Sequence, residues 1–255
     1  MNDFNLLFRQ RIGLSTDQKI TFDHLDDILD RTARILPFEN MSIMLEKTDS
    51  ITKKHLIDKI LKRYEGGLCY ELNPLLHFFL LDNAFKTAMY YGRVHNGNEY
   101  GDKTHVMFLV KHKGKDYLID TGFGSNLPLK PVPMSGETIH SRNGAFRIIE
   151  EGNAHILEMN LSSKQKGWTN GYKFYTYDPV RNVEDLNTIQ KKIINSETSP
   201  FNKDPLITSF TKEGRHTLTK TSYSVWSGTE FEKVKIEPDQ FHKYAERHFN
   251  FKFYS

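Results

Sequence analysis

The run Glu65-Gly66-Gly67-Leu68-Cys69-Tyr70-Glu71-Leu72-Asn73 places the only cysteine of the 255-residue chain two residues after a diglycine. Apolar residues then recur at helical spacing, at Leu72, Leu75, Leu76, Phe79 and Leu80. This spacing predicts a helix that begins at or near Cys69, with Pro74 in or just past the first turn, where proline is tolerated.

A thiol at the start of a helix has two interpretations. Unpaired N–H groups and the positive end of the helix dipole favour the thiolate, which is the reactive form of cysteine. A buried structural cysteine is the alternative, because free cysteine also packs as a small apolar residue. A single cysteine excludes an internal disulfide, which is typical of proteins in a reducing cytoplasm.

The composition is that of an ordinary globular protein. With 35 basic and 32 acidic residues the net charge is only +3, so no strong field indicates nucleic acid or an anionic membrane as a partner. The N-terminus, with Asp3 at its third position, lacks the basic start and apolar segment of a signal peptide. The apolar stretch from Leu75 to Leu81 is too short to span a bilayer. We therefore expect a cytoplasmic protein without nucleic-acid or membrane partners.

The first third of the chain has helical periodicity. Thr21 is placed to cap a helix that runs until Pro37, and Thr52 to cap a second that runs to Tyr64. We expect the second helix to end at Gly66 and Gly67, because glycine accepts the left-handed conformation of a helix C-cap.

From about residue 87 the period changes to two, and turn residues separate the segments. Strands are predicted at Lys86–Val94, Thr104–Lys111, Asp116–Phe123, Ala145–Glu150, His155–Leu161 and Tyr172–Tyr177. They indicate an antiparallel sheet or barrel. Beyond Pro179 the pattern predicts a helix at Val183–Ile194, strands at Leu206–Phe210, Arg215–Thr221 and Ser222–Ser227, and a final helix around Phe241 to His248.

Two polar residues lie in otherwise apolar strands of one hairpin, His105 and Asp120. If the loop is centred between Lys113 and Gly114, residues whose numbers sum to 227 face each other, and Asp120 becomes the diagonal neighbour of His105 on the same face. A hydrogen-bonded pair then explains both residues, either as a purely structural pair or as the base and orienting group that a cysteine nucleophile needs.

Other kinds of site find less support. His242 and His248 lack the clustered partners that a zinc site requires, and no metal is expected. Gly66 and Gly67 lack the remaining spacing of a phosphate-binding loop.

Four segments together resemble the arylamine N-acetyltransferase family, in order and in spacing. They are Leu36-Pro37-Phe38-Glu39-Asn40, the Gly-Gly-x-Cys-x-Glu-x-Asn run at residues 66 to 73, the strand histidine His105, and Asp120-x-Gly122-Phe123-Gly124. The resemblance covers roughly residues 20 to 125 and is that of a bacterial member. It thins after Pro179, where Thr198-Ser199-Pro200-Phe201 and Gly214-Arg215-His216-Thr217-Leu218 are similar in kind to family segments.

The resemblance implies an α+β fold with a catalytic core like that of papain-type cysteine peptidases. An N-terminal helical bundle at residues 1–85 would carry the nucleophile. An antiparallel β-barrel at residues 86–180 would carry the histidine and the aspartate, and an α/β lid would follow at residues 181–255.

The family's chemistry implies acetyl-coenzyme A as acyl donor and small aromatic amines or hydrazines as acceptors, in a ping-pong reaction. By motif match, Cys69 would be acylated, His105 would activate it and Asp120 would orient His105. The resemblance further implies Phe38 and Phe123 as the lining of the acceptor pocket, and Thr104, Gly124 and Phe201 as coenzyme A contacts.

One residue departs from the family pattern, which usually has arginine immediately before the diglycine where this chain has Glu65. An anion close to the nucleophile would disfavour the thiolate if it pointed inward, although Arg63 is near enough in sequence to compensate. We expect Glu65 to face solvent. The alternative functions are a Cys-His-Asp amide hydrolase, a transglutaminase-like acyl transferase and a catalytically silent ligand-binding relative.

Overall fold

The computed structural model describes residues 2–164, 167–228 and 230–253 of the chain. Its helices are α1 (Asp3–Ile12), α2 (Leu25–Ile35), α3 (Met41–Met44), α4 (Lys53–Leu56), α5 (Cys69–Asp82), α6 (Leu186–Asn195) and α7 (Phe241–Phe249). A π-helical segment, Ile57–Lys62, continues α4. Short 3₁₀ turns lie at Phe22–His24, Gly124–Asn126, Val183–Asp185, Pro200–Asn202 and Pro238–Gln240.

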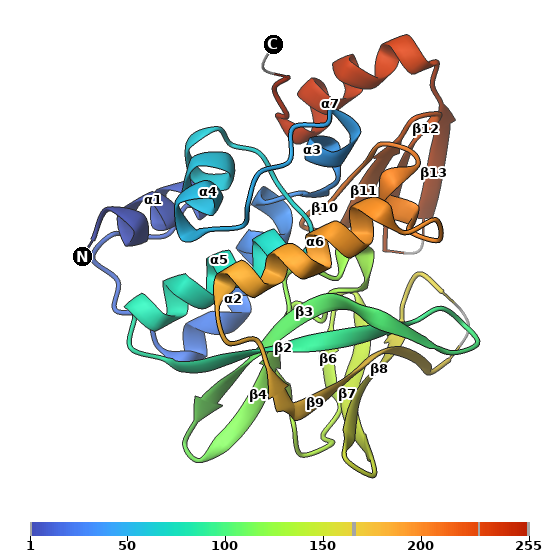
Figure 1. Ribbon diagram of the computed structural model, residues 1–255. Coiled ribbons are helices and arrows are strands. Elements are labelled where there is room, and N and C mark those ends of the chain that lie inside the picture. The colour runs from blue at the N-terminus through green and yellow to red at the C-terminus, as the bar shows by residue number, and fades with distance from the viewer. Residues whose placement is uncertain (1, 165–166, 229, 254–255) are drawn as a thin grey trace.

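Eight strands form one antiparallel sheet that curls into a nearly closed barrel below the helices (Figure 1). Their order across the sheet is β5-β4-β3-β2-β9-β8-β7-β6. Their bounds are β2 (Lys86–His95), β3 (Tyr100–His112), β4 (Lys115–Ile119), β5 (Val132–Pro133), β6 (Ile139–Ser141), β7 (Gly144–Glu151), β8 (Ala154–Leu161) and β9 (Thr169–Pro179). The six strands predicted in this region are confirmed, with ends shifted by up to four residues.

A second antiparallel sheet has the order β1-β10-β11-β12-β13. It comprises β1 (Phe38–Glu39), β10 (Leu206–Phe210), β11 (Gly214–Thr219), β12 (Ser222–Ser227) and β13 (Glu230–Lys235). Strand β13, which the periodicity did not predict, forms the outer edge, and all of its residues are exposed (Figure 1). The short strand β1 belongs to the N-terminal third, yet it pairs with β10. The division into three domains stays a prediction.

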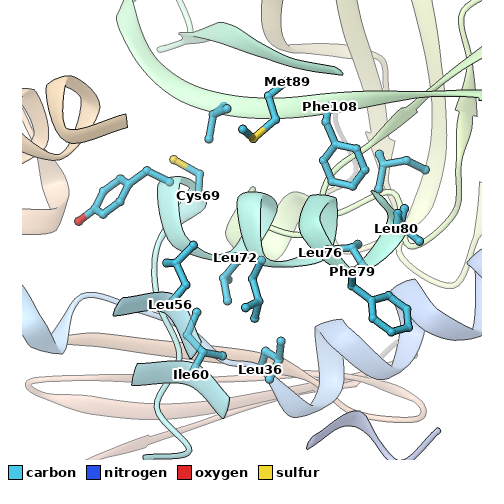
Figure 2. Close-up of a cluster of buried hydrophobic side chains, with 14 of the residues drawn as sticks. Leu36, Leu56, Ile60, Cys69, Leu72, Leu76, Phe79, Leu80, Met89 and Phe108 are labelled. Carbon is cyan, nitrogen blue, oxygen red and sulfur yellow. The ribbon is translucent and has the colours of Figure 1, made fainter. Parts of the chain in front are cut away.

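Helix α5 is the centre of the larger core, and its start at Cys69 confirms the predicted helix. It lies between the barrel strands on one side and the N-terminal helices on the other (Figure 2). Leu72, Leu76 and Phe79 pack in the larger hydrophobic core. The sulfur of Cys69 points away from them, at the N-terminal end of the helix. Pro74 is the sixth residue of the helix, so it lies inside α5 and leaves the Tyr70 carbonyl without its N–H partner four residues later.

The two expected helix caps have different outcomes. The Thr52 hydroxyl accepts a hydrogen bond from the His55 N–H and caps α4 as predicted. Thr21 instead precedes the turn Phe22–His24, so α2 begins only at Leu25.

The glycines after α4 do not act as a left-handed cap, and that prediction was wrong. Tyr64 adopts the positive φ, at 62°, whereas neither Gly66 nor Gly67 has one. Both glycines instead allow neighbouring segments to approach the backbone closely. A Cβ on Gly66 would lie 2.0 Å from the Pro37 carbonyl oxygen, and one on Gly67 would lie 2.7 Å from Glu71 Oε2.

The predicted register of the β3–β4 hairpin is confirmed by the pairs Phe108 with Ile119 and Leu109 with Leu118. The ladder ends at Ile119, however, so Asp120 to Phe123 leave the sheet. His105 is consequently paired with Gly92 of β2 and not with Gly122. This exit from the strand brings the residues after Ile119 toward the start of α5.

In the part of the chain that the structure describes, every helix is too short or too polar to cross a bilayer.

Candidate active site

Cys69 is the first residue of α5 and is buried, with a free thiol. Glu71 holds the preceding residue in place, because its Oε2 accepts a 3.0 Å hydrogen bond from the Leu68 N–H. The Sγ atom lies 3.6 Å from the Thr104 carbonyl oxygen, to which it donates. The thiol therefore lies between the helix terminus and strand β3.

His105 and Asp120 form the hydrogen-bonded pair that the hairpin register predicted. His105 Nε2 lies 2.8 Å from Asp120 Oδ2, and both residues are buried. Burial by itself lowers the pKa of the His105 imidazole, but the charge and hydrogen bond of Asp120 outweigh it, with a smaller contribution from Cys69, and raise this pKa to about 10. His105 is therefore protonated at neutral pH, with Cys69 as its second hydrogen-bonding neighbour.

The Asp120 carboxylate is held on both oxygens. Tyr172 donates its phenol to Oδ2 at 2.9 Å, Asn73 donates its amide to Oδ1 at 2.9 Å, and the Gly122 N–H donates to Oδ1 at 2.8 Å. Because each partner comes from a different element, the carboxylate has one orientation. The carboxylate can change orientation only if α5, the loop after β4 and strand β9 are all disturbed.

Asn73 connects the nucleophile helix to the loop that follows β4. Its amide nitrogen also donates to the Val106 carbonyl at 2.7 Å, and its oxygen accepts from the Thr121 N–H at 2.8 Å. Gly122 then touches the helix directly, since a Cβ at this position would lie 2.5 Å from the Cα of Cys69. The glycine thus fixes how closely the loop approaches the thiol.

A cavity of about 570 Å³ opens next to Cys69. Seven of the eight site residues expected from the sequence line it: Phe38, Cys69, Thr104, His105, Phe123, Gly124 and Phe201. Asp120 lies behind His105 and does not reach the cavity, which is the position of an orienting group.

Aromatic rings form one side of this cavity. The Phe38 and Phe201 rings meet edge to face at 5.5 Å, and the Phe123 ring lies 5.1 Å from the His105 ring and 5.0 Å from that of Tyr172. Such rings offer a flat aromatic molecule both face and edge contacts close to the thiol.

A second charged cluster lies on the other side of the α5 N-terminus. The Lys59 ammonium is fully buried, 2.7 Å from Glu71 Oε1 and 3.4 Å from Glu39 Oε1. Burial lowers the pKa of Lys59, yet Glu39 and Glu71 more than offset this effect, so the pKa is raised. Glu39 Oε2 also accepts a hydrogen bond from the Met41 N–H. The cluster therefore joins strand β1, the π-helical segment and α5.

Glu65 does not face solvent, contrary to the expectation. Its side chain is 16 % exposed and pairs with Arg63 at 2.6 Å. It does not belong to the cavity lining, and its charge acts on Lys59 and Glu39 instead. Arg63 therefore neutralises Glu65, and the buried cation next to the diglycine is Lys59.

Sequence reasoning assigned no role to Asn73, Tyr172 or Lys59. Asn73 was part of the quoted motif, and its position one helical turn after Cys69 could have indicated a contact. Lys59 interrupts the apolar pattern beside Leu56 and Ile60, which is a signal for a paired buried cation. Tyr172 has no such signal, because it reaches Asp120 only through the curvature of the barrel. Among the described residues no group of His, Cys, Asp or Glu could hold a metal ion.

A thiol at a helix start, with an imidazole and a carboxylate supplied by an adjoining sheet, defines a cysteine enzyme with a papain-like core. A sequence model of an N-acetyltransferase family matches residues 21–254. The chain therefore belongs to the arylamine N-acetyltransferase family, as the resemblance predicted, and is an acyltransferase.

The relatives of this chain match it over nearly its full length. It is 34 % identical over 253 residues to the uncharacterized acetyltransferase YvcN of Bacillus subtilis, covering 98 % of each chain. It superimposes on an arylamine N-acetyltransferase of Bacillus cereus with a TM-score of 0.93 at 37 % identity, covering 99 % of this chain and 100 % of that one. For arylamine N-acetyltransferase C of Bacillus anthracis the TM-score is 0.92, at the same identity and coverage. The Bacillus cereus enzyme has a unique Cys-His-Glu catalytic triad, whereas His105 here is bonded to an aspartate.

Proposed function

We propose that the protein transfers the acetyl group of acetyl-coenzyme A to arylamines and arylhydrazines, in a ping-pong reaction through acetyl-Cys69. The observation that supports this most directly is the connected series Cys69, His105 and Asp120 beside a cavity lined by phenylalanines. Family membership supports the acyl donor and the class of acceptor.

In the first half-reaction His105 holds the proton of the Cys69 thiol, and the sulfur attacks the thioester carbonyl. Collapse of the tetrahedral intermediate breaks the carbon–sulfur bond to coenzyme A, and His105 returns its proton to the departing thiolate. The products are acetyl-Cys69 and free coenzyme A. The Glu71 and Leu72 N–H groups bond the Leu68 carbonyl, so those of Cys69 and Tyr70, at the very start of α5, are the ones placed to stabilise the oxyanion.

In the second half-reaction the amine nitrogen attacks the acetyl carbonyl of Cys69 while His105 accepts a proton from the nitrogen. Cys69 departs as the thiolate and His105 keeps that proton, so the enzyme ends with the same protonated His105 with which it began. Asp120 keeps the imidazole oriented in both steps and stabilises its cationic form.

The lining residues divide between the two substrates. Phe38 and Phe123 would bind the aromatic ring of the acceptor, and Thr104, Gly124 and Phe201 would lie along the pantetheine arm of coenzyme A. We place the protein in the cytoplasm, in the metabolism of foreign aromatic amines, without a metal.

The test is intact mass after incubation with acetyl-coenzyme A, followed by release of the label with a panel of arylamines. Wild type should gain the mass of one acetyl group and lose it faster with arylamine than in buffer. Cys69→Ala should take up no label and lose transfer by at least about 10⁴-fold while keeping its unfolding midpoint.

Other outcomes would identify the alternatives. A label released as quickly by water as by amine would indicate a hydrolase, and one released by peptide amines would indicate a transglutaminase-like enzyme. An unlabelled wild type, with Cys69 no faster toward iodoacetamide than a model thiol, would indicate a silent relative.

A further inference from the structure

A second cavity, of about 320 Å³, lies on the reverse side of the five-stranded sheet. Its lining residues are Arg11, Arg34, Ile35, Pro37, Ser209, His216, Arg247, His248, Phe249 and Asn250. Neighbouring residues of β10 and β11 alternate between the two cavities. Thr208 and Thr217, paired across the strands, line the catalytic cavity, whereas the next pair, Ser209 and His216, lines this one.

Three guanidinium groups line this cavity, and none of its lining residues is acidic. Arg11, Arg34 and Arg247 stand in the last turns of α1, α2 and α7 respectively. Each helix C-terminus contributes roughly half a negative charge. Three guanidinium charges against three such termini and the Asp30 carboxylate that pairs with Arg34 leave an excess of about +0.5 at the cavity.

Part of this donor capacity is already used. Arg11 donates to the carbonyl oxygens of Ile60 and Tyr64, and Arg34 Nε donates to Asp30 at 2.7 Å. Within the described residues Arg247 makes no hydrogen bond or ion pair, and it is an exposed residue of the lining.

The remaining polar groups form a neutral chain. Ser209 Oγ lies 2.6 Å from His216 Nε2, His216 Nδ1 lies 3.3 Å from the Tyr223 hydroxyl, and that hydroxyl lies 3.2 Å from His248 Nδ1. Burial, followed by the neighbouring His248, lowers the pKa of His216 to about 4, and burial, followed by Arg247, lowers that of His248. Burial is the larger cause for both histidines, and both are neutral hydrogen-bonding groups at neutral pH.

We propose that this cavity is a binding site for a small phosphate-bearing anion, separate from the acetyl-transfer pocket. The guanidinium fork matches the oxygens of a phosphate, and three such groups suit a dianion better than a single carboxylate. Ser209 and His248 add neutral hydrogen-bonding groups, and the volume accepts a phosphate with a small organic group attached.

Isothermal titration with inorganic phosphate and with pyrophosphate tests the site, with succinate as a dicarboxylate of similar charge. Arg247→Gln is the informative variant, because Arg247 makes no hydrogen bond or ion pair within the described residues and is exposed. Arg181→Gln is the matched control, because Arg181 is also an exposed arginine without a hydrogen bond or ion pair in the described residues. Neither arginine lines the catalytic cavity.

Wild type and Arg181→Gln should bind phosphate or pyrophosphate saturably, whereas Arg247→Gln should bind about tenfold more weakly, as expected for the loss of one charge-assisted hydrogen bond. Acetyl transfer should be unchanged in both variants. The proposal is overturned if wild type shows no saturable binding at about 10 mM phosphate. Equal affinities in the two variants, or succinate binding as tight as that of phosphate, would also overturn it.

Discussion

Two buried charge clusters flank the N-terminus of α5, and they differ in what surrounds the cation. The imidazole of His105 is bonded to Asp120 on one side and faces Cys69 and the cavity on the other. The ammonium of Lys59 lies between the carboxylates of Glu39 and Glu71, away from the cavity. A buried cation that keeps one side open to a substrate pocket can exchange a proton, whereas one enclosed by carboxylates can only hold elements together.

This difference predicts separable effects. Removing the partner of His105 should reduce catalysis more than folding, and removing Lys59 should reduce folding more than catalysis.

The largest effect is expected for Asp120→Asn. The amide leaves the orientation and charge of His105 unsupported, and transfer should fall by about 10³ to 10⁴-fold. The measurement is kcat/KM for acetyl transfer, with urea unfolding of the same preparation. Asp116→Asn, on the same hairpin but 41 % exposed, is the control and should keep its activity. Retained transfer with lowered stability would make the His105–Asp120 pair structural only.

The next effect is expected for Lys59→Met, which leaves two buried carboxylates without their cation. Breaking a buried ion cluster in this way costs about 3 to 5 kcal/mol of unfolding free energy. Lys54→Met, which removes an exposed lysine paired with Asp58, should leave the unfolding midpoint unchanged. Adding Glu39→Gln to Lys59→Met should restore part of the stability. A Lys59→Met protein as stable as wild type would show that the cluster does not hold β1 to α5.

A third prediction concerns pH. The pKa of His105 is raised from its ordinary value of about 6.5 to about 10, so the folded state binds this proton more tightly than the unfolded chain does. The resulting stability is complete below about pH 6.5 and is lost as the pH rises through about 10. The stability difference between wild type and Asp120→Asn, from urea unfolding, should therefore shrink between pH 7 and pH 10.5.

The Lys59 cluster supplies the contrast in that experiment. Since the pKa of Lys59 is raised above its ordinary range, the deficit of Lys59→Met should persist at pH 10.5. If both deficits shrink equally, the two clusters do not differ in their titration.

The smallest effect is expected for Glu65→Arg. Arg63 already neutralises Glu65, whose side chain lies on the Lys59 side of the helix start. The midpoint of the pH profile for iodoacetamide alkylation should move by less than about half a unit. Glu65→Gln removes the negative charge without adding a positive one, so it distinguishes the effect of losing the carboxylate from that of gaining a guanidinium. A shift of about one unit or more in Glu65→Arg would connect this position to the thiol.

Local patterns were sufficient for part of this architecture. The helical period after Cys69 and the hairpin arithmetic between Lys113 and Gly114 placed a thiol, an imidazole and a carboxylate on two elements, and the structure brings them together. The family resemblance then supplied the order of the domains and the chemistry.

Features that depend on packing between distant segments could not be predicted in the same way. Tyr172 reaches Asp120 across 52 residues, through a strand whose pairing with its neighbours is shifted by irregularities. The diglycine was interpreted from its conformational freedom, but its role is to let Pro37 and Glu71 approach the backbone. That role becomes visible only when the neighbouring segments are placed.

The order of charges along the exposed edge strand β13 determines whether two copies of the protein can pair through this edge. Its sequence, Glu-Phe-Glu-Lys-Val-Lys from Glu230 to Lys235, is acidic in its first half and basic in its second. Two copies joined edge to edge as antiparallel strands are related by a two-fold axis perpendicular to the sheet, so the residue at the axis faces its own copy. Every register that pairs these residues then sets Glu230 or Glu232 against glutamate, or Lys233 or Lys235 against lysine. Like charges directly opposite each other disfavour such pairing, so the order of charges along β13 protects an open sheet edge from its own copies.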